Sequence, residues 1–591
     1  MQKCLPIVVT GVLVAHAALL TWGAYRHSPT IDESRWLPAG LAHWDGDFSA
    51  GRVNPPLVRL VAAAPVMLAV MGNEQQETNS TSARTKFAED DGACWLFTMG
   101  RWACIPFSLV GGYVCYCWGR DLYGTASGMI ALMLWCFSPN ILAHAQIVAH
   151  DAPAASLGIA AAYLFWKWLR QPTWERAILA GVVLGVAQLM KTTLVILFGL
   201  WPALWLVWYS TGSSQTGDRG GRRQSVQLLL LLALGLNVLN LGYGFDGSFR
   251  KLKNYTFVSQ TLSGVDGQDG NRFARSWLGS LPVPLPAEYL LGIDQQKRDL
   301  EGGSVYAQTY LRGQWHDRGL WYFYLYALLI KVPLGSWGLL LLSAAVRAFH
   351  LDDLKRARDE VLLVIPGLSV LVLASSQTGF TDHLRYVLPI FPFVFVWISR
   401  VGCAFVQGSR AFRLSATVAL GWSIGSSLWI YPHSLSYFNE LVGGPRNGDY
   451  HLVSSNIDYG QDLLYLKAWL DKHPEARPFH LAYWNQETVD PAILGIGYST
   501  PPSGPAPELK PPYSEPEKLG PHPGWHAANV NVVRGDHWPG RTQFPDFGYY
   551  GYLLNFEPVA TAGYSIYVYN INVEEANRVR RRMNLPPISN D

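Results

Sequence analysis

The sequence predicts a polytopic, all-α membrane protein with a small α/β domain at its C-terminal end. Three observations support this fold class. Of the 591 residues, 49% are apolar and only 15% are charged, whereas a soluble protein carries about 25% charged residues. Apolar runs recur through residues 1–431. The chain after residue 431 alternates short helix-like and strand-like stretches with Pro-rich segments.

About eleven apolar runs are candidate membrane-spanning helices, since a span needs roughly 20 mainly apolar residues. Nine of them are residues 5–25, 93–118, 124–142, 151–168, 225–244, 320–346, 360–376, 386–403 and 413–431. Two shorter runs, 175–190 and 192–209, flank Lys191. The first run has no small-residue cleavage site before Arg26, so we expect it to remain as a span.

The run 56–72 is expected to lie in the plane of the membrane rather than to cross it. It contains Arg59 and Pro65 and follows Pro55, and proline suits the first turn of a helix. If this run does not span, the Lys and Arg clusters between the other runs share one side, which the positive-inside rule identifies as the cytoplasm. The N-terminus then lies inside.

This register predicts a membrane domain over residues 1–431 and an extracytoplasmic α/β domain over residues 432–591. Two further segments of the membrane domain lie outside, the first loop 26–92 and the large loop 245–319. Within the tail we expect a helix at 462–471 and strands at 479–483 and 565–569.

Composition excludes several other classes. A net charge of +3 gives no electrostatic reason to expect a nucleic-acid partner. All seven cysteines lie in or beside apolar runs, so neither a disulfide framework nor a zinc site is expected. No metal or cofactor site is indicated, although a divalent metal ion is compatible with the sequence.

Ionisable residues gather at the predicted extracytoplasmic ends of the spans. A charge at the centre of the bilayer costs roughly 2.5–3.5 kcal/mol, so the end at which charges accumulate is informative. The polar residues at this end are Asp32, Glu33, Asn54, His144, His150, Asp151, Lys191, His383 and Arg385. Simpler roles stay open for single members: Lys191 or His144 as interfacial residues, Asp151 as a helix cap, and Arg385 as a headgroup anchor.

Such a cluster has the parts for sugar transfer from a phosphate carrier. A carboxylate can act as general base towards an acceptor hydroxyl. Nearby cations can hold the phosphate and stabilise its charge as it leaves. A phosphate leaves without needing a proton, so one base is sufficient, whereas a glycosidase needs two carboxyl groups that face each other across the bond.

The polar segments also resemble the motifs of a known family. Ile31-Asp32-Glu33-Ser34, Ala39-Gly40, Asp45-Gly46-Asp47-Phe48 and Asn54-Pro55-Pro56-Leu57 resemble the first loop of the GT-C glycosyltransferases. The branch is that of the protein O-mannosyltransferases and the lipid A aminoarabinose transferases. Similar to later motifs of this branch are Arg101, His150-Asp151-Ala152-Pro153, Lys191-Thr192 and Arg385-Tyr386-Val387-Leu388-Pro389.

The resemblance implies a GT-C-like fold and a role for each residue. Asp32 is then the catalytic base, with Glu33 beside it. Acceptor or sugar positioning is implied for Asp151, His150 and Asn54. Binding of the lipid phosphate is implied for Arg101, Lys191, Arg385 and His383. No metal ligands are implied.

Two features depart from the aminoarabinose transferases. Asn54 stands where those enzymes usually have Lys before Pro-Pro-Leu. The tail segments Tyr437–Glu440 and Ser455–Asp462 instead resemble the tail of bacterial members of unassigned specificity.

We therefore expect an inverting glycosyltransferase in the bacterial cytoplasmic (inner) membrane, with its active site on the periplasmic face. It would move a sugar from a polyprenyl-phosphate donor to a hydroxyl of an extracytoplasmic protein, lipid or polysaccharide. A transporter or flippase of lipid-linked sugars is the main alternative, although no internal repeat of the kind common in transporters is evident. A membrane-anchored binding protein would leave the first-loop motif unexplained.

Overall fold

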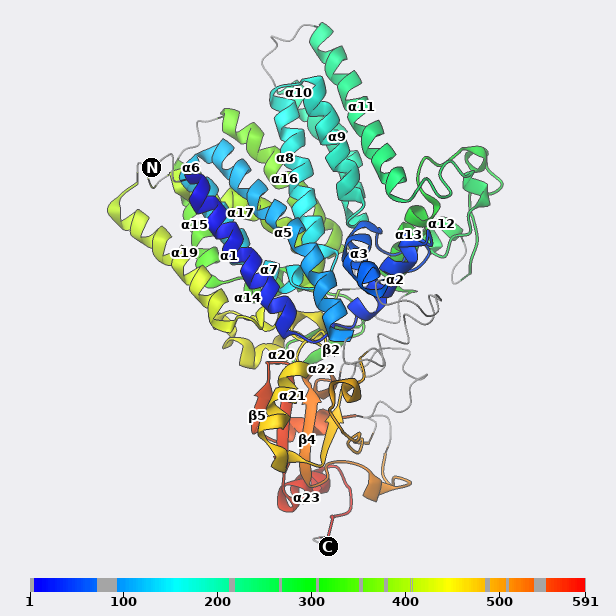
Figure 1. Ribbon diagram of the computed structural model, residues 1–591, viewed down its shortest axis with the longest axis vertical. Helices are drawn as coiled ribbons and strands as arrows, with labels where there is room; N and C mark the ends of the chain where they lie inside the picture. Colours follow the sequence, from blue (N-terminus) through cyan, green and yellow to red (C-terminus); the bar gives the residue numbers. More distant parts are fainter. Residues whose placement is uncertain are drawn as a thin grey trace.

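The computed structural model contains a helical body with a smaller α/β unit at one end (Figure 1). The residues that it describes are 5–71, 93–211, 218–264, 268–303, 308–349, 354–376, 381–403, 405, 408–483, 489–505, 510–535 and 549–589.

Long helices make up the body. They are α1 (Leu5–Arg26), α5 (Ala93–Tyr123), α6 (Thr125–Cys136), α7 (Pro139–Ala145), α8 (Asp151–Arg170), α9 (Trp174–Gln188), α10 (Ile196–Ser210), α11 (Asp218–Gly242), α14 (Phe323–Lys331), α15 (Leu334–Phe349), α16 (Leu354–Ser376), α17 (Phe391–Ile398) and α19 (Arg410–Ile430). Short 3-10 turns η2 (Thr192–Val195) and η6 (Leu384–Ile390) precede α10 and α17.

Among the described residues, five helical stretches are long and apolar enough to cross a membrane: Leu5–Arg26, Thr192–Ser210, Gly220–Gly242, Ala357–Ser376 and Leu384–Cys403. Two bent pairs, α6 with α7 and α14 with α15, raise this number to seven if each pair is one span. The prediction of about eleven spans is therefore not confirmed.

Helices do form at the four remaining runs, as α5, α8, α9 and α19. α9 has only 15 residues. α8 is rich in alanine and almost wholly buried, and small residues are typical of helices that contact other helices rather than lipid. A helix inside a bundle need not be strongly apolar, which accounts for α8. α19, by contrast, is mostly exposed.

The first loop contains α2 (Glu33–Trp44) and α3 (Leu57–Met71). α3 is the helix predicted to lie in the membrane plane, and it is a short apolar helix that packs against α2 and α5. A side chain at Gly40 would place its Cβ 2.4 Å from the carbonyl oxygen of Arg59, so glycine is required where α2 meets α3. Both helices lie at the end of the body that faces the α/β unit (Figure 1).

The large loop before α14 contains α12 (Gln260–Ser263), α13 (Ala287–Arg298) and the antiparallel pair β1 (Thr309–Leu311) and β2 (Gln314–His316). α13 joins the body through a hydrogen bond from the Tyr289 hydroxyl to Gln188 Oε1, at 3.1 Å.

The tail folds around a four-stranded sheet of order β3-β4-β6-β5. Its strands are β3 (Phe479–Ala482), β4 (Gly524–Asn529), β5 (Ala560–Ala562) and β6 (Ile566–Ile571), and its helices are α20 (Gly448–His451), α21 (Leu463–Lys472), α22 (Val530–Val533) and α23 (Val573–Arg582). β3 and β4 are parallel, and the other two pairs are antiparallel. Asn572 and Glu575 form a capping box that starts α23.

The two strands and the helix expected in the tail correspond to β3, β6 and α21. The strands β4 and β5 were not predicted. That the tail is a separate domain and lies outside the membrane stays a prediction.

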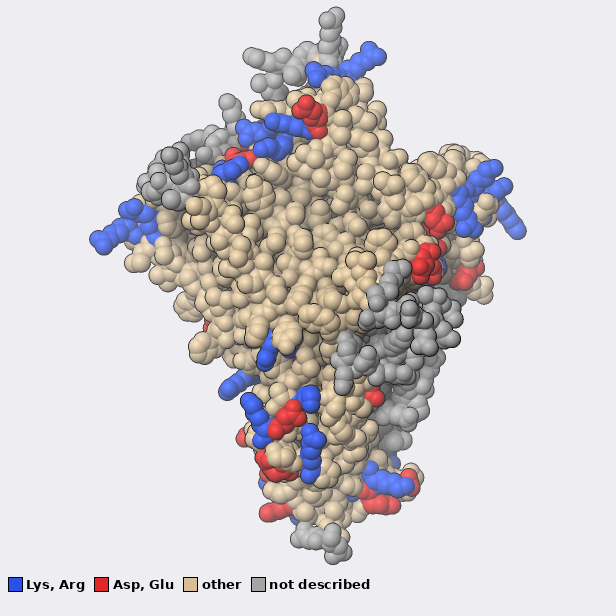
Figure 2. Space-filling model, in the orientation of Figure 1, with Lys and Arg blue, Asp and Glu red and all other residues tan. Residues whose placement is uncertain are grey.

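Charged side chains are unevenly distributed over the molecule. On the face drawn in Figure 2 they are concentrated at the upper end, on the α/β unit and at the right edge, where Figure 1 places α12 and α13, and the helical body between them is almost free of charge. Such an uncharged band suits contact with hydrocarbon, where a charge is costly. The chain is a multi-pass integral membrane protein.

The predicted sidedness can be tested with single cysteines at two exposed positions, Thr211 after α10 and Lys472 at the end of α21. In right-side-out vesicles, a membrane-impermeant maleimide should label Lys472→Cys, whereas Thr211→Cys should react only after permeabilisation. The unsubstituted protein, with its own free cysteines, is the baseline. Labelling of Thr211→Cys in sealed vesicles would contradict the assignment of 56–72 to the membrane plane.

Candidate active site

The residues just before α2 are held by the tail. Ser28 N donates to the carbonyl of Gln461 at 3.1 Å, and Ile31 N donates to the carbonyl of Tyr459 at 3.1 Å. The Ser28 hydroxyl donates to the carbonyl of Gly460 at 2.8 Å. Two segments more than four hundred residues apart thus run side by side, and they position Asp32.

Asp32 lies at the first turn of α2 and binds two donors. Its Oδ2 accepts hydrogen bonds from Arg385 Nη1, at 3.0 Å, and from the hydroxyl of Tyr459. Arg385 also donates to that hydroxyl, and its guanidinium lies 4.8 Å from the centre of the Tyr459 ring. The Asp32 side chain remains 21% exposed. A carboxylate that is oriented by charged hydrogen bonds yet accessible has the properties required of a general base.

Glu33, the neighbouring carboxylate, has a different environment. Both its side chain and that of Arg101 have 0% exposure, and the two form a double hydrogen bond, with Arg101 Nε to Oε1 at 2.8 Å and Nη2 to Oε2 at 2.5 Å. Thr30 and the backbone N of Val148 also donate to the Glu33 carboxylate.

The other donors of Arg101 also form hydrogen bonds within the protein. It donates to the carbonyls of Ala24, His27 and Ser28, each at 2.8 Å. All its nitrogens have acceptors, and none is exposed. Glu33 and Arg101 therefore form a buried ion pair that links α1, α2 and α5. Every side-chain nitrogen of Arg101 is used within the protein, so none is left to bind a lipid phosphate.

A second ion pair lies beside the Asp32–Arg385 pair. Asp151, the first residue of α8, accepts from Lys191 Nζ at 2.5 Å. Lys191 lies just before η2, and its ammonium is 5.0 Å from the centre of the Tyr386 ring. Arg385 is close enough to act electrostatically on Asp151 as well. Two carboxylates and two cations thus face one small region.

Unpaired polar atoms surround this region. Within the described part of the chain, Arg385 Nε, His144 Nδ1 and both ring nitrogens of His150 are buried and have no hydrogen-bond partner. The His150 ring instead meets Trp36 edge-on, with centroids 4.8 Å apart. Buried polar groups are normally satisfied, so such unpaired atoms are available for a ligand.

His383 and Asn54 are less central. His383 Nδ1 forms a hydrogen bond with the Ser455 hydroxyl at 2.8 Å and lies 3.5 Å from Asp382. Asn54 belongs to the turn before α3, where Arg59 binds its carbonyl together with those of Ala50 and Gly51. No hydrogen bond joins the Asn54 side chain to the other predicted site residues.

Sequence reasoning did not single out Tyr459 or Tyr386. Tyr459 belongs to the tail segment Ser455–Asp462, which resembled bacterial family members, and Tyr386 directly follows Arg385. Burial raises the pKa of the Tyr459 hydroxyl well above its ordinary value, so this hydroxyl stays protonated and donates to Asp32.

The predicted site residues do not form a group of metal ligands. Among the described residues the structure contains one such group elsewhere, formed by His27, His433 and Asp462.

Residues 97–235 match the family model described as dolichyl-phosphate-mannose-protein mannosyltransferase. The matched segment contains Arg101, His150, Asp151 and Lys191. The resemblance to the glycosyltransferase branch of the protein O-mannosyltransferases is therefore confirmed. No curated protein matches the chain in sequence.

Two solved structures are similar over most of the chain. The ArnT of Cupriavidus metallidurans bound to undecaprenyl phosphate is 13% identical, with 95% of this chain and 97% of that chain covered and a TM-score of 0.42. The oligosaccharyltransferase of Archaeoglobus fulgidus in the apo form is 11% identical, with 89% and 70% covered and a TM-score of 0.41.

The buried Glu33–Arg101 pair predicts a stability effect. Glu33→Gln removes the charge that compensates Arg101, and breaking a buried ion pair costs about 3–5 kcal/mol. Thermal unfolding of the purified protein in detergent should therefore occur at a clearly lower temperature. The control is Asp471→Asn, which breaks the half-exposed pair of Asp471 with Lys467 and should change stability by less than about 1 kcal/mol. Equal shifts in the two variants would contradict the structural role of Glu33.

Proposed function

We propose that this protein is an inverting glycosyltransferase that moves a sugar from a polyprenyl-phosphate donor to a hydroxyl group of an extracytoplasmic acceptor. The observation that carries the proposal is the Asp32 carboxylate, which is accessible, held by Arg385 and Tyr459, and adjacent to the Asp151–Lys191 pair. The family matched over residues 97–235 supports it, because its description names a sugar linked to a lipid phosphate.

In the proposed reaction Asp32 accepts the proton of the acceptor hydroxyl. The hydroxyl oxygen attacks the anomeric carbon of the donor from the face opposite the phosphate, and the bond between that carbon and the phosphate oxygen breaks. The electron pair of this bond goes to the phosphate, which leaves as an anion. One displacement inverts the anomeric centre, and no second carboxylate is needed as acid.

Arg385 and Lys191 are the proposed phosphate ligands. Arg385 aligns Asp32 through Nη1, while its Nε has no partner among the described residues. Lys191 presents an ammonium that Asp151 holds in place. Charge-assisted hydrogen bonds from these groups would strengthen as the phosphate gains charge during bond breaking. Interactions that are stronger in the transition state than in the ground state accelerate the reaction.

The remaining residues have supporting roles in this proposal. His150, with two unpaired ring nitrogens, is available to bind sugar or acceptor hydroxyls. His383 fixes the segment before Arg385 through Ser455. Asn54 belongs to the turn held by Arg59, and Glu33 and Arg101 hold the fold. We place the site on the periplasmic face of the bacterial cytoplasmic membrane.

The base can be tested with Asp32→Asn, which keeps the size of the side chain and removes its proton affinity. Transfer from a polyprenyl-phosphate sugar should fall by about 10²–10⁴-fold, the usual contribution of a general base, while thermal stability changes little. The control is Asp45→Asn, at an exposed carboxylate of the same loop. Near wild-type transfer by purified Asp32→Asn would remove Asp32 from this role. Movement of lipid-linked sugar across proteoliposomes without any transfer product would instead favour a flippase.

Tyr459→Phe tests the contact between the tail and the base. Losing one hydrogen bond to a charged group costs about 1.5–3 kcal/mol, and each 1.36 kcal/mol corresponds to tenfold in rate. We therefore expect kcat to fall about 10- to 100-fold, with little change in KM for the donor. Tyr498→Phe is the matched control, because the Tyr498 hydroxyl also donates to an aspartate, Asp490, but on the far part of the tail. An unchanged kcat in Tyr459→Phe would show that the tail does not contribute to the site.

A further inference from the structure

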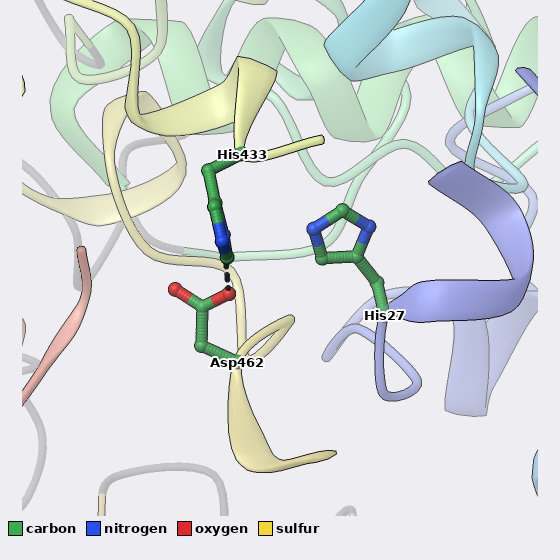
Figure 3. Close-up of side chains that lie close together, drawn as sticks. All are labelled: His27, His433 and Asp462. Carbon is green, nitrogen blue, oxygen red and sulfur yellow. Dashed lines mark hydrogen bonds and ion pairs between the residues drawn. The ribbon is translucent and has the colours of Figure 1, made fainter. Parts of the chain in front are cut away.

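We propose that His27, His433 and Asp462 bind a divalent transition-metal ion, zinc by chemistry, which fastens the tail to the helical body. The inference does not depend on the proposed reaction. The three residues come from distant segments: His27 follows α1, His433 follows α19, and Asp462 precedes α21. Their ligand atoms all lie within 4.8 Å of one another, and Figure 3 shows the His27 ring facing the His433–Asp462 pair.

The hydrogen bond that His27 makes leaves its other nitrogen free for a metal. Its Nδ1 lies 2.8 Å from the carbonyl oxygen of Gly23, and a carbonyl can only accept, so the proton is on Nδ1. The lone pair is then on Nε2, which is buried and has no partner among the described residues. Metal-binding histidines are commonly held by such a backbone contact.

Asp462 is oriented in the same way. Its Oδ2 accepts from the Ser565 hydroxyl at 2.9 Å and from the backbone N of Tyr564 at 3.3 Å. These contacts leave Oδ1 directed at His433 Nδ1, 3.3 Å away.

The charge balance favours a cation here. The Asp462 side chain has 0% exposure, and its ion-pair partner among the described residues is His433. Arg101, which is close enough to act electrostatically on His27, is already paired with Glu33. A buried carboxylate needs compensation, and a metal ion in place of the proton between His433 and Asp462 would supply it.

The ligand set and its spacing suit zinc. Two imidazoles and one carboxylate are a common zinc set, whereas Mg²⁺ and Ca²⁺ prefer oxygen ligands. Bond lengths of about 2.0–2.2 Å place neighbouring ligand atoms of a tetrahedral ion about 3.3 Å apart. The present separations therefore require a closure of at most about 1.5 Å. Three protein ligands leave a fourth position for water, and His433, the most exposed of the three, lies on the solvent side.

A metal ion at this position would also affect the candidate active site around Asp32. Asp462 lies three residues after Tyr459, in the tail segment whose backbone pairs with Ser28 and Ile31. His27 directly precedes Ser28. A metal ion between His27 and Asp462 would thus hold together the segment before α2 and the tail segment 459–461, whose pairing brings Tyr459 to Asp32.

The test measures metal on the full-length protein in detergent, stripped with a chelator and reloaded with Zn²⁺. We expect about one zinc ion per chain by elemental analysis, and a thermal transition that rises on loading. His27→Gln and His433→Gln should each weaken zinc binding by at least about tenfold, because even residues behind a ligand contribute 10- to 100-fold. The matched control is His473→Gln, which removes a half-exposed histidine that is paired with Glu475 at 2.8 Å but has no third ligand.

Two results would overturn the proposal. One is zinc binding by His27→Gln and His433→Gln as tight as that of His473→Gln. The other is measured on the unsubstituted protein and so does not depend on the folding of variants. Loading with Co²⁺ should produce the visible absorption of a tetrahedral site with nitrogen and oxygen ligands. A protein that binds no stoichiometric Zn²⁺ and shows no such absorption with Co²⁺ has no metal site here.

Discussion

The buried pair of Glu33 and Arg101 is the interaction on which the rest of the site depends. Arg101 extends from α5 and binds the last carbonyls around the end of α1, and the Glu33 carboxylate binds the backbone before α8. Three segments therefore meet at the Glu33–Arg101 ion pair. Because a buried ion pair tolerates the loss of neither partner, the start of α2 is held rigidly, and Asp32 is the adjacent residue.

Two neighbouring carboxylates thus have different surroundings. Glu33 is enclosed and fully hydrogen-bonded, whereas Asp32 is oriented by two donors and remains partly accessible. The two arginines differ in a similar way. Every side-chain nitrogen of Arg101 has an acceptor, while the buried Nε of Arg385 has no partner among the described residues. The enclosed Glu33–Arg101 pair holds the geometry. In the proposed reaction, the neighbouring Asp32 and Arg385 bind the acceptor hydroxyl and the donor phosphate.

The tail is part of this arrangement rather than an appendage. Its residues 459–461 pair with the first loop through backbone hydrogen bonds, and the Tyr459 hydroxyl contacts Asp32. Two of the proposed metal ligands, His27 and Asp462, lie beside each other at one end of this contact. In this view the tail does not bind substrate by itself. It sets the position and the hydrogen bonding of Asp32, the proposed base.

Local sequence was sufficient to predict the helical membrane class, a helix at 56–72, two of the four strands in the tail sheet and the glycosyltransferase resemblance. These features depend on apolar periodicity and short motifs, which a single segment carries. The resemblance pointed to Asp32 as the base, but the sequence did not show that Glu33 and Arg101 would be enclosed while Asp32 and Arg385 are not. It also did not indicate Tyr459 or the cluster of His27, His433 and Asp462. Which carboxylate is enclosed and which residues from segments hundreds of positions apart come into contact is decided by tertiary packing, because burial and partner charges exist only once the segments have met.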